Sequence, residues 1–497
     1  MLNSYEKFVR DIGLVFGTDL VKILASILII PIITKTLGAV GFGIWNQLRI
    51  TITLISTFII MGLHHAFLRH LAGETEKGKI SSNFWALILT VAALGIFVAS
   101  SFYILSNSLY AYVFGEEEVP HLIIIATVLM VIFPLDYFMT SYFQTFRQMK
   151  NHSVFTIGEM ATQVGLLTLL IHTGYGVFGA VLSFLIVKIV FFLLRSSRIV
   201  VQIGFTPPDF SIILPYIRFG FPMVLSGTFF LIVNSGDRYI INYFLGIKEV
   251  GIYSFVYNIG NLIMFIMTPV MYILYPTIAD CWKNREYEAV NRYVRYSIKY
   301  NLLLSIPCAF FLGVLSKEIT LIFSSPQFLS AYLLIPVLAS GFLIFGLGVV
   351  GEHMMIVLGR TRAIFHLYFL LSFFNISMNI ILVPRMGIRA SALITLISFS
   401  FYAFVTLYTS WKKIQFHLDY RPLFKALIAS SAASLVLWWM KSSIGYRLAL
   451  SLCLAVTIYL VLLYLLRGVE KKEIEFLINV VFSRSLRKED KVEEVIK

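Results

Sequence analysis

The chain has 497 residues, of which 59% are hydrophobic and 13% are charged, and its formal net charge is +14. Soluble globular proteins carry roughly 25% charged residues, so this composition excludes a soluble globular protein and predicts an integral membrane protein. The three cysteines are far apart and show no CxxC or Cys/His ligand spacing, which argues against a disulfide framework or a zinc site.

Taken in chain order, long apolar runs predict an all-α membrane protein. An outer-membrane barrel would instead show short segments in which apolar and polar residues alternate. Fourteen spans are predicted, near residues 12–34, 42–64, 83–108, 119–142, 152–172, 175–194, 212–234, 250–275, 297–316, 331–357, 363–383, 387–409, 422–441 and 445–466. The N-terminus shows no short apolar region with a small-residue cleavage site, so the first span is expected to remain as a helix.

The charges between the spans predict the orientation. Most of the 40 Lys and Arg residues fall between spans on one side, and the acidic run at residues 116–118 falls on the other. By the positive-inside rule, both termini are expected in the cytoplasm of a multi-pass protein in the cell (inner) membrane. The basic excess then contacts anionic membrane lipids, and no nucleic-acid partner is needed to explain it.

A short motif occurs twice. TLGAVGFGIWN (residues 36–46) and FLGIKEVGIYS (residues 244–254) share Leu-Gly, a second glycine, and then Ile with an aromatic residue. Two further pairs have nearly the same separation: KNHSVF with RTRAIF, and YGVFGAVLSFL with MGIRASALITL. Six spans per repeat is an even number, so both repeats start on the same side, as in transporters that move two parallel lobes around a central site.

The predicted organisation therefore has four parts. They are an N-terminal six-helix lobe (residues 1–200), a C-terminal six-helix lobe (201–411), an added helix pair (412–467) and a cytoplasmic tail (468–497). In addition, the segment 280–300 mixes aromatic with basic residues and is expected to form an amphipathic helix on the inner membrane surface.

Two segments carry a resemblance to a known family. They are SGDRYIINYFLGIKEVGIYSFVYNIGN (residues 235–261) and NISMNIILVPRMGIRASALITLIS (residues 375–398). With the two lobes and the added pair, they resemble the polysaccharide transporter (Wzx-type) flippases of the MOP exporter superfamily. The resemblance implies transport of a polyprenyl-diphosphate-linked oligosaccharide, an O-antigen or other cell-surface repeat unit, from the inner to the outer leaflet by alternating access. It also implies coupling to H⁺ or Na⁺, contact with other polysaccharide-assembly proteins, and no cofactor.

Polar and basic stripes inside the spans predict the transport site. Residues three and seven positions apart share one helix face, and charges inside spans are rare enough to suggest function. The predicted head-group contacts are Lys22, Arg49, Asn46, Thr53, Arg218, Ser254, Tyr257 and Asn261. Lys22 and Arg49 are the expected phosphate-binding cations, although Asp19 and Lys22 can instead neutralise each other along one helix turn.

Ion coupling needs a carboxylate that is protonated in one conformation and ionised in the other. The candidates are Asp19, Asp136, Glu159 and Glu352, and the sequence does not choose among them. Lys188 is expected to extend its amine to the membrane interface. The adjacent Asp237 and Arg238 read as a structural ion pair, and the pair Asn375 and Asn379 as a link between helices.

Two other functions remain as alternatives. A polysaccharide polymerase or ligase usually has a large external loop, whereas the longest external segments predicted here, residues 109–118 and 235–249, are short. No Walker loop or Asp-x-Asp motif is present, so an enzyme is not predicted. An exporter of organic cations would need carboxylates and aromatics in its site, whereas the best-placed stripes carry Lys22 and Arg49.

Overall fold

The computed structural model describes residues 2–106, 121–415, 419–440 and 446–468. All regular elements among them are helices, the structure expected in a bilayer, because a helix satisfies its own backbone hydrogen bonds. The described residues contain 13 helical stretches long and apolar enough to span a membrane, and one of them, Met149–Ile203, comprises two helices in succession. The predicted number of fourteen spans is therefore confirmed.

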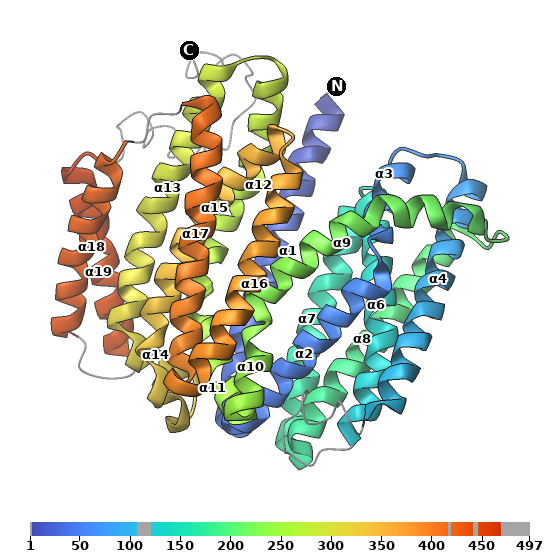
Figure 1. The fold of residues 1–497 in the computed structure, drawn as a ribbon, viewed down its shortest axis with the longest axis horizontal. Coiled ribbons are helices and arrows are strands. Elements are labelled where there is room, and N and C mark those ends of the chain that lie inside the picture. Colours follow the sequence, from blue (N-terminus) through green and yellow to red (C-terminus); the bar gives the residue numbers. More distant parts are fainter. Residues whose placement is uncertain (1, 107–120, 416–418, 441–445, 469–497) are drawn as a thin grey trace.

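The first half of the chain forms one group of helices, which we call the first helix group. Its elements are α1 (Leu2–Thr36), α2 (Gly38–Ile60), α3 (Leu63–Leu71), α4 (Lys77–Ile104), α6 (His121–Thr145), α7 (Met149–Leu170), the π turn η1 (Ile171–Tyr175) and α8 (Gly176–Ile203). Within this group α6 packs against α4 and α8, α7 packs against α1 and α8, and α2 packs against α6 (Figure 1).

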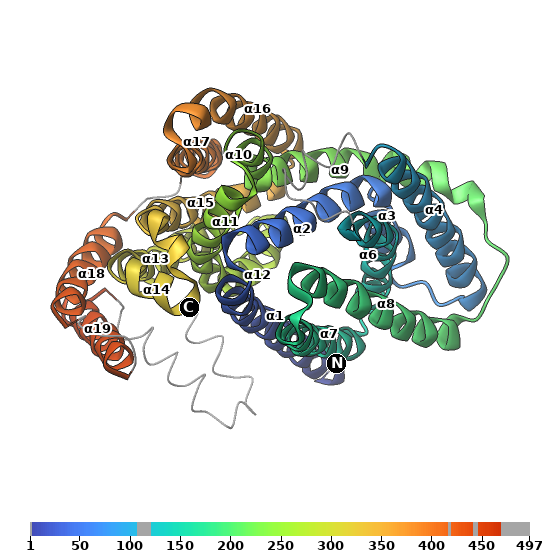
Figure 2. The ribbon, with the colours of Figure 1, turned by 90° about the horizontal axis from the view of Figure 1, so that it is seen from below.

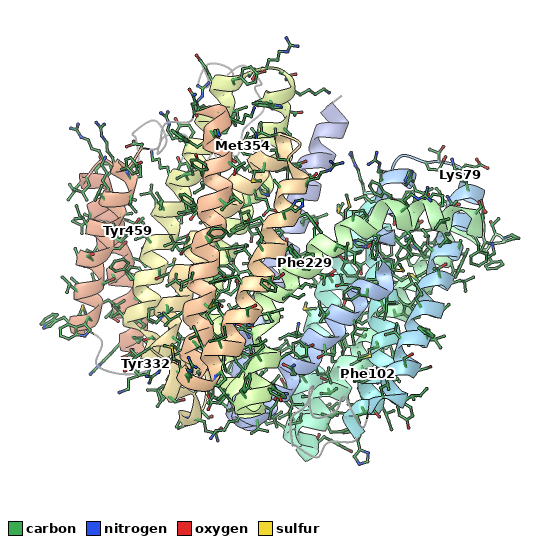
Figure 3. The ribbon with its side chains drawn as sticks, in the orientation of Figure 1. Lys79, Phe102, Phe229, Tyr332, Met354 and Tyr459 are labelled. Carbon is green, nitrogen blue, oxygen red and sulfur yellow. The ribbon has the colours of Figure 1, made fainter. Side chains whose placement is uncertain are left out.

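The second helix group follows after the short turn η2 (Phe210–Ile212). Its elements are α9 (Ile213–Ser235), α10 (Asp237–Leu245), α11 (Ile247–Gly260), α12 (Leu262–Lys283), α13 (Tyr287–Val314), α14 (Ser316–Phe323), η3 (Pro326–Ala331), α15 (Leu334–Val357), α16 (Thr361–Met386) and α17 (Ile388–Ile414). The most extensive helix pair is α15 with α17. Phe229 of α9 lies against Phe365 and Phe369 of α16, with ring centroids 5.6 and 5.2 Å apart, near the centre of the molecule (Figure 3).

Two further helices, α18 (Arg421–Met440) and α19 (Tyr446–Leu465), lie at one edge of the molecule (Figure 2). They pack on each other, and α18 packs on α13. Tyr459 of α19 donates a hydrogen bond to the carbonyl of Leu303 in α13 at 2.5 Å.

The repeated glycines explain the repeated motif. The first glycine of each copy, Gly38 and Gly246, takes a left-handed backbone conformation (φ 69° and 85°) in the turn between two helices. The second glycines, Gly43 of α2 and Gly251 of α11, bring the two helix groups together. A Cβ on Gly43 would lie 2.1 Å from the carbonyl oxygen of Ile247, so only glycine permits this approach of the backbones.

A second close contact joins α9 to the first helix group. Gly62, in the turn between α2 and α3, meets Gly220 of α9, and a Cβ on Gly220 would lie 2.5 Å from the Gly62 carbonyl oxygen. Beside it the ring of His70 stacks on Tyr216, with centroids 4.7 Å apart. The helix α9 thus crosses from α3 and α4 to α10 and bridges both groups (Figure 1).

The structure departs from the sequence prediction in the segment 280–300. This segment forms the end of α12, a short turn and the first half of the continuous helix α13, so the prediction of a separate surface helix is wrong. The predicted lobe boundaries at residues 200 and 411 fall inside the last turns of α8 and α17. The acidic run at 116–118 and residues 469–497 of the predicted tail lie outside the described residues.

Candidate functional site: a cavity between the two helix groups

A cavity of about 460 Å³ lies between α2 on one side and α9, α10 and α11 on the other. Its volume is within the range of about 300–1,000 Å³ usual for ligand pockets. The lining residues are Asn46, Arg49, Ile50, Thr53, Leu54, Leu231, Ile232, Ser235, Gly236, Arg238, Tyr239, Ile240, Ser254, Tyr257, Asn258 and Ile376. Of the eight head-group contacts predicted from the sequence, Asn46, Arg49, Thr53, Ser254 and Tyr257 meet here.

The wall from the first helix group presents a cation without an acidic partner. Arg49 is exposed to the cavity, and its guanidinium carbon lies 5.6 Å from the ring centroid of Trp45 and 5.9 Å from that of Phe184. Among the ion pairs of the described residues, none involves Arg49. The aromatic faces attract this cation without neutralising it, so it remains available to an anion in the cavity.

The wall from the second helix group is a connected set of polar side chains. The Tyr257 hydroxyl donates to Asn234 Oδ1 at 3.1 Å, and the guanidinium of Arg238 lies over the Tyr257 ring at 3.8 Å from its centroid. The Ser254 hydroxyl is buried without a hydrogen-bond partner among the described residues. The Ser254 hydroxyl on this wall can therefore form a hydrogen bond with a ligand in the cavity.

A smaller cavity of about 220 Å³ adjoins the first. The two cavities share Asn46, Arg49 and Asn258, and the smaller one extends to Ser26 of α1 and to Asn261. Asn261, another predicted contact, thus lies one cavity away from the main group.

Lys22 and Arg218, the remaining predicted contacts, line neither cavity. Lys22 forms an ion pair with Asp19 at 2.9 Å, with side chains 41% and 34% exposed, which corresponds to the alternative reading of mutual neutralisation. Arg218 is exposed on α9, two residues before the close contact of Gly220 with Gly62. The assignment of Lys22 and Arg218 to substrate has no support from the geometry and stays a prediction.

Two of the acidic candidates belong to a buried four-charge cluster, which we define as Asp136, Glu159, Lys188 and Arg195. The Lys188 amine lies 2.9 Å from Asp136 Oδ2 and 2.6 Å from Glu159 Oε1. Arg195, only 2% exposed, donates a hydrogen bond from Nη1 to Asp136 and another from Nη2 to Glu159. The cluster joins α6, α7 and α8 and has no net charge.

The cluster corrects two sequence interpretations. Lys188 does not extend to the interface, because it is 14% exposed and paired with two carboxylates from neighbouring helices. Arg195 falls just after the predicted span 175–194, whereas it lies inside α8, which continues to Ile203. Lys188 and Arg195 are seven residues apart, so they share a helix face, and this spacing was the available signal.

The fourth acidic candidate, Glu352 of α15, has a different environment. Its Oε2 accepts hydrogen bonds from the hydroxyls of Tyr368 (2.7 Å) and Tyr402. None of the ion pairs among the described residues includes it. Asp237 pairs with Arg238 at 2.7 Å and also accepts from the Tyr253 hydroxyl at 2.6 Å, so the predicted ion pair is present in the structure.

The pair of asparagines predicted to link helices does so. Asn379 Nδ2 donates to Asn375 Oδ1 at 3.0 Å within α16, and Ser391 of α17 donates to Asn379 Oδ1 at 2.6 Å. In the part of the chain that the structure describes, no group of three or more His, Cys, Asp and Glu side chains is placed to hold a metal ion.

Comparison with known proteins identifies the family. The family model described as "Polysaccharide biosynthesis protein" matches residues 8–282, more than half of the chain. The chain belongs to this family. A second family model, described as "Lipid II flippase MurJ", matches residues 252–459. These two matches confirm the resemblance to the polysaccharide transporter flippases of the MOP superfamily that the sequence shows.

One curated relative is an uncharacterized membrane protein, MJ1068, of Methanocaldococcus jannaschii. It is 24% identical over 173 residues, which is 34% of each chain, so the match spans about a third of that relative's length.

Solved structures share the fold of this family member. The lipid II flippase MurJ in an inward closed conformation matches with a TM-score of 0.73 and 15% identity, over 92% of this chain and 98% of that chain. An inward-facing multidrug resistance MATE transporter of the MOP superfamily matches with a TM-score of 0.64 and 15% identity, over 80% and 94%. A MOP superfamily transporter from Pyrococcus furiosus matches with 0.57 and 16%, over 82% and 95%. At these identities the likeness establishes the fold, and all three are membrane transporters by description.

Proposed function

We propose that the protein is a flippase that moves a polyprenyl-diphosphate-linked oligosaccharide, an O-antigen or related repeat unit, from the inner to the outer leaflet. The observation that carries the proposal is the cation Arg49, which lines a cavity between the two helix groups and has no ion-pair partner among the residues that the structure describes. A buried or intramembrane charge without a partner is costly and marks a ligand or ion pathway. The family match and the description of a matching family model as a lipid II flippase support a lipid-linked substrate.

The physical task explains why the cavity has this chemistry. A sugar-phosphate head group cannot enter hydrocarbon unsolvated, because unpaired polar groups there cost several kcal/mol each. Asn46, Thr53 and Ser254 offer hydrogen bonds, and Arg49 offers charge, while the lipid chain stays in the bilayer. The two helix groups act as the two lobes, which open the cavity to each side of the membrane in turn.

We assign the coupling role to Glu352 among the four acidic candidates. Asp136 and Glu159 are each bound by two cations, and Asp19 is bound by Lys22. Glu352 is held by two tyrosine hydroxyls, so the arrival of a proton there breaks no ion pair. Coupling of transport to an inward proton gradient follows from this assignment, with both termini in the cytoplasm of the inner membrane.

The test is leaflet-resolved transport in proteoliposomes. A lipid-diphosphate oligosaccharide is added, and its externally accessible head groups are counted over time for the wild type and for Arg49→Gln. The proposal expects transport by the wild type and its loss in the variant at unchanged melting temperature. Export of organic cations without lipid transport would instead favour a multidrug exporter of the same superfamily. Elongation or transfer of the glycan would favour a polymerase or ligase.

A further inference from the structure

The start of α2, in the first helix group, is capped by a side chain of the second. The backbone N–H of Ala39 donates a hydrogen bond to Oε1 of Gln327 in η3 at 3.1 Å. The first N–H groups of a helix have no partner inside that helix, and Leu37, the residue before α2, has no polar side chain to supply one. The cap that a helix usually takes from a neighbouring residue therefore comes from a residue 288 positions further along the chain.

A second hydrogen bond joins the same two regions in the opposite sense. The hydroxyl of Thr34, which is fully buried near the end of α1, donates to the carbonyl of Phe323, the last residue of α14, at 2.6 Å. The last carbonyl groups of a helix also lack a partner inside the helix. The turn from α1 to α2 and the segment from α14 to η3 thus each satisfy a helix end of the other, and both bonds cross between the two helix groups.

The same contact contains an aromatic side chain, Phe328 of η3, which is fully buried. Its ring centroid lies 6.3 Å from that of Phe42 in α2 and 5.1 Å from that of Phe255 in α11. These are the two helices that approach each other most closely at Gly43 and Gly251. Separation of the helix groups at this point would expose the apolar surface of the ring, which opposes the separation.

These contacts lie at one end of the cavity. Along α2, Ala39 and Phe42 come before Asn46 and Arg49, which line the cavity, and each residue advances about 1.5 Å along the helix axis. The helices α11 and α14 lie at the end of the molecule opposite the start of α1 (Figure 1). The cavity is therefore closed toward that end, where η3 and the α2–α11 contact lie.

We propose that η3 is a latch, which keeps the cavity shut on the side opposite the start of α1 and releases when the cavity opens to that side. The latch consists of the Gln327–Ala39 bond, the Thr34–Phe323 bond and the buried ring of Phe328. This inference rests on the proposed function only in taking the two helix groups as the moving lobes, and it specifies which contacts break when they move. By the predicted orientation, the latch side is external.

The chemistry of the latch suits a contact that forms and breaks in every cycle. Both hydrogen bonds join neutral groups, and water replaces a neutral hydrogen bond at little net cost once the groups are exposed. The four-charge cluster inside the first helix group is different, because separating its buried ion pairs would leave unpaired charges. The cluster therefore keeps its group together while the latch opens and closes.

The test measures how readily the latch side opens. Ile50, which lines the cavity, is replaced by cysteine as a reporter in a full-length chain whose three cysteines are changed to serine. A membrane-impermeant maleimide is then applied to right-side-out and to inverted membrane vesicles. The latch side is the side from which this parent protein reacts more slowly. No lipid substrate is needed, so the result does not depend on what the protein transports.

Each hydrogen bond of the latch has a variant that removes it alone. Thr34→Val keeps the shape of the side chain, and Gln327→Ala removes the cap. We expect each variant to speed labelling from the latch side roughly fivefold, the population change that one net hydrogen bond provides, and the double variant to multiply the two factors. Ser330→Ala is the matched control, because Ser330 is exposed and its hydroxyl donates within η3, to the Gln327 carbonyl.

The melting temperature of each variant is recorded, so that a folding defect is not mistaken for opening. Unchanged labelling in both single variants, or equal acceleration by Ser330→Ala, would show that these contacts are static packing and would overturn the latch. A double variant no faster than either single variant would overturn it as well, because the two bonds would not restrain one opening step.

The labelling result separates the latch from the proposed function. Multiplied acceleration in a protein that moves no lipid-linked oligosaccharide would keep the latch and overturn the flippase proposal. Unchanged labelling in a protein that does move it would overturn the latch alone.

Discussion

The four-charge cluster of the first helix group and the cavity between the groups both place cations inside the protein, but they balance them differently. In the cluster, Lys188 and Arg195 face Asp136 and Glu159, and each cation contacts both carboxylates. In the cavity, Arg49 takes part in none of the ion pairs found within the part of the chain that the structure describes. Buried charges are tolerated when they are paired and hydrogen-bonded. The balanced set therefore indicates a scaffold, and the unbalanced one a place for an anionic ligand.

The largest effect is expected when one cation is removed from the four-charge cluster, which tests whether the cluster is a scaffold. Arg195→Met leaves two carboxylates facing Lys188 alone, and removal of one partner from a buried pair costs about 3–5 kcal/mol. We expect a corresponding fall in the free energy of unfolding, measured by denaturation in detergent micelles. Arg198→Met is the matched control, because Arg198 lies on the same helix and is exposed.

A neutral version of the cluster sharpens the result. Arg195→Met combined with Glu159→Gln leaves one carboxylate facing one amine, so the double variant should recover part of the lost stability. If Arg195→Met costs no more than Arg198→Met, the cluster does not act as a scaffold.

The next largest effect concerns the contact between the two halves. A Cβ on Gly251 would lie 1.9 Å from the carbonyl oxygen of Ala39, so Gly251→Ala must push α11 away from α2. Overpacking of this kind costs roughly 1–3 kcal/mol, and we expect lower stability together with loss of transport. The control is Gly227→Ala in α9, where an added Cβ meets nothing within 4 Å. Equal behaviour of the two variants would show that the α2–α11 contact is dispensable.

Arg49 and Lys22 test the cavity side of the comparison. Arg49→Gln should reduce lipid transport roughly ten- to hundredfold through lost phosphate contacts, at an unchanged melting temperature. Lys22→Gln should have a small effect, because exposed ion pairs contribute about 0–1 kcal/mol and Lys22 lines neither cavity. Proteoliposome assays on the two variants in parallel measure the difference. A larger defect in Lys22→Gln would move the site toward α1.

The sequence was sufficient where helix periodicity alone decides the outcome. The spacing of Asn46, Arg49 and Thr53 predicted one helix face. The structure brings these three residues into one cavity with Ser254 and Tyr257, which were also among the predicted head-group contacts. The long apolar runs likewise gave the number of spans.

The sequence was insufficient where a side chain's partners come from other helices. Lys188 looked like a residue near a membrane interface because its carboxylates belong to α6 and α7. Arg195 was missed because α8 extends further than its apolar run, to Ile203. Arg238 was predicted only as the ion-pair partner of Asp237, and its place on the cavity wall is a property of the packed structure.

The smallest expected effect on stability, and the one that decides coupling, concerns Glu352. Glu352→Gln keeps an oxygen that accepts from Tyr368 and Tyr402, so the fold should be retained. If this carboxyl carries the coupled proton, wild-type transport accelerates under an imposed proton gradient and the variant's transport does not. The measurement is lipid flux with and without the gradient, and Glu318→Gln, on α14 of the same helix group, is the control.

Loss of gradient dependence in Glu352→Gln alone would assign the proton to Glu352 of α15. If Glu352→Gln still responds to the proton gradient, the coupling carboxylate is Asp19, Asp136 or Glu159 instead. If the wild type responds to a sodium gradient alone, the coupling ion is sodium and the proton assignment is wrong.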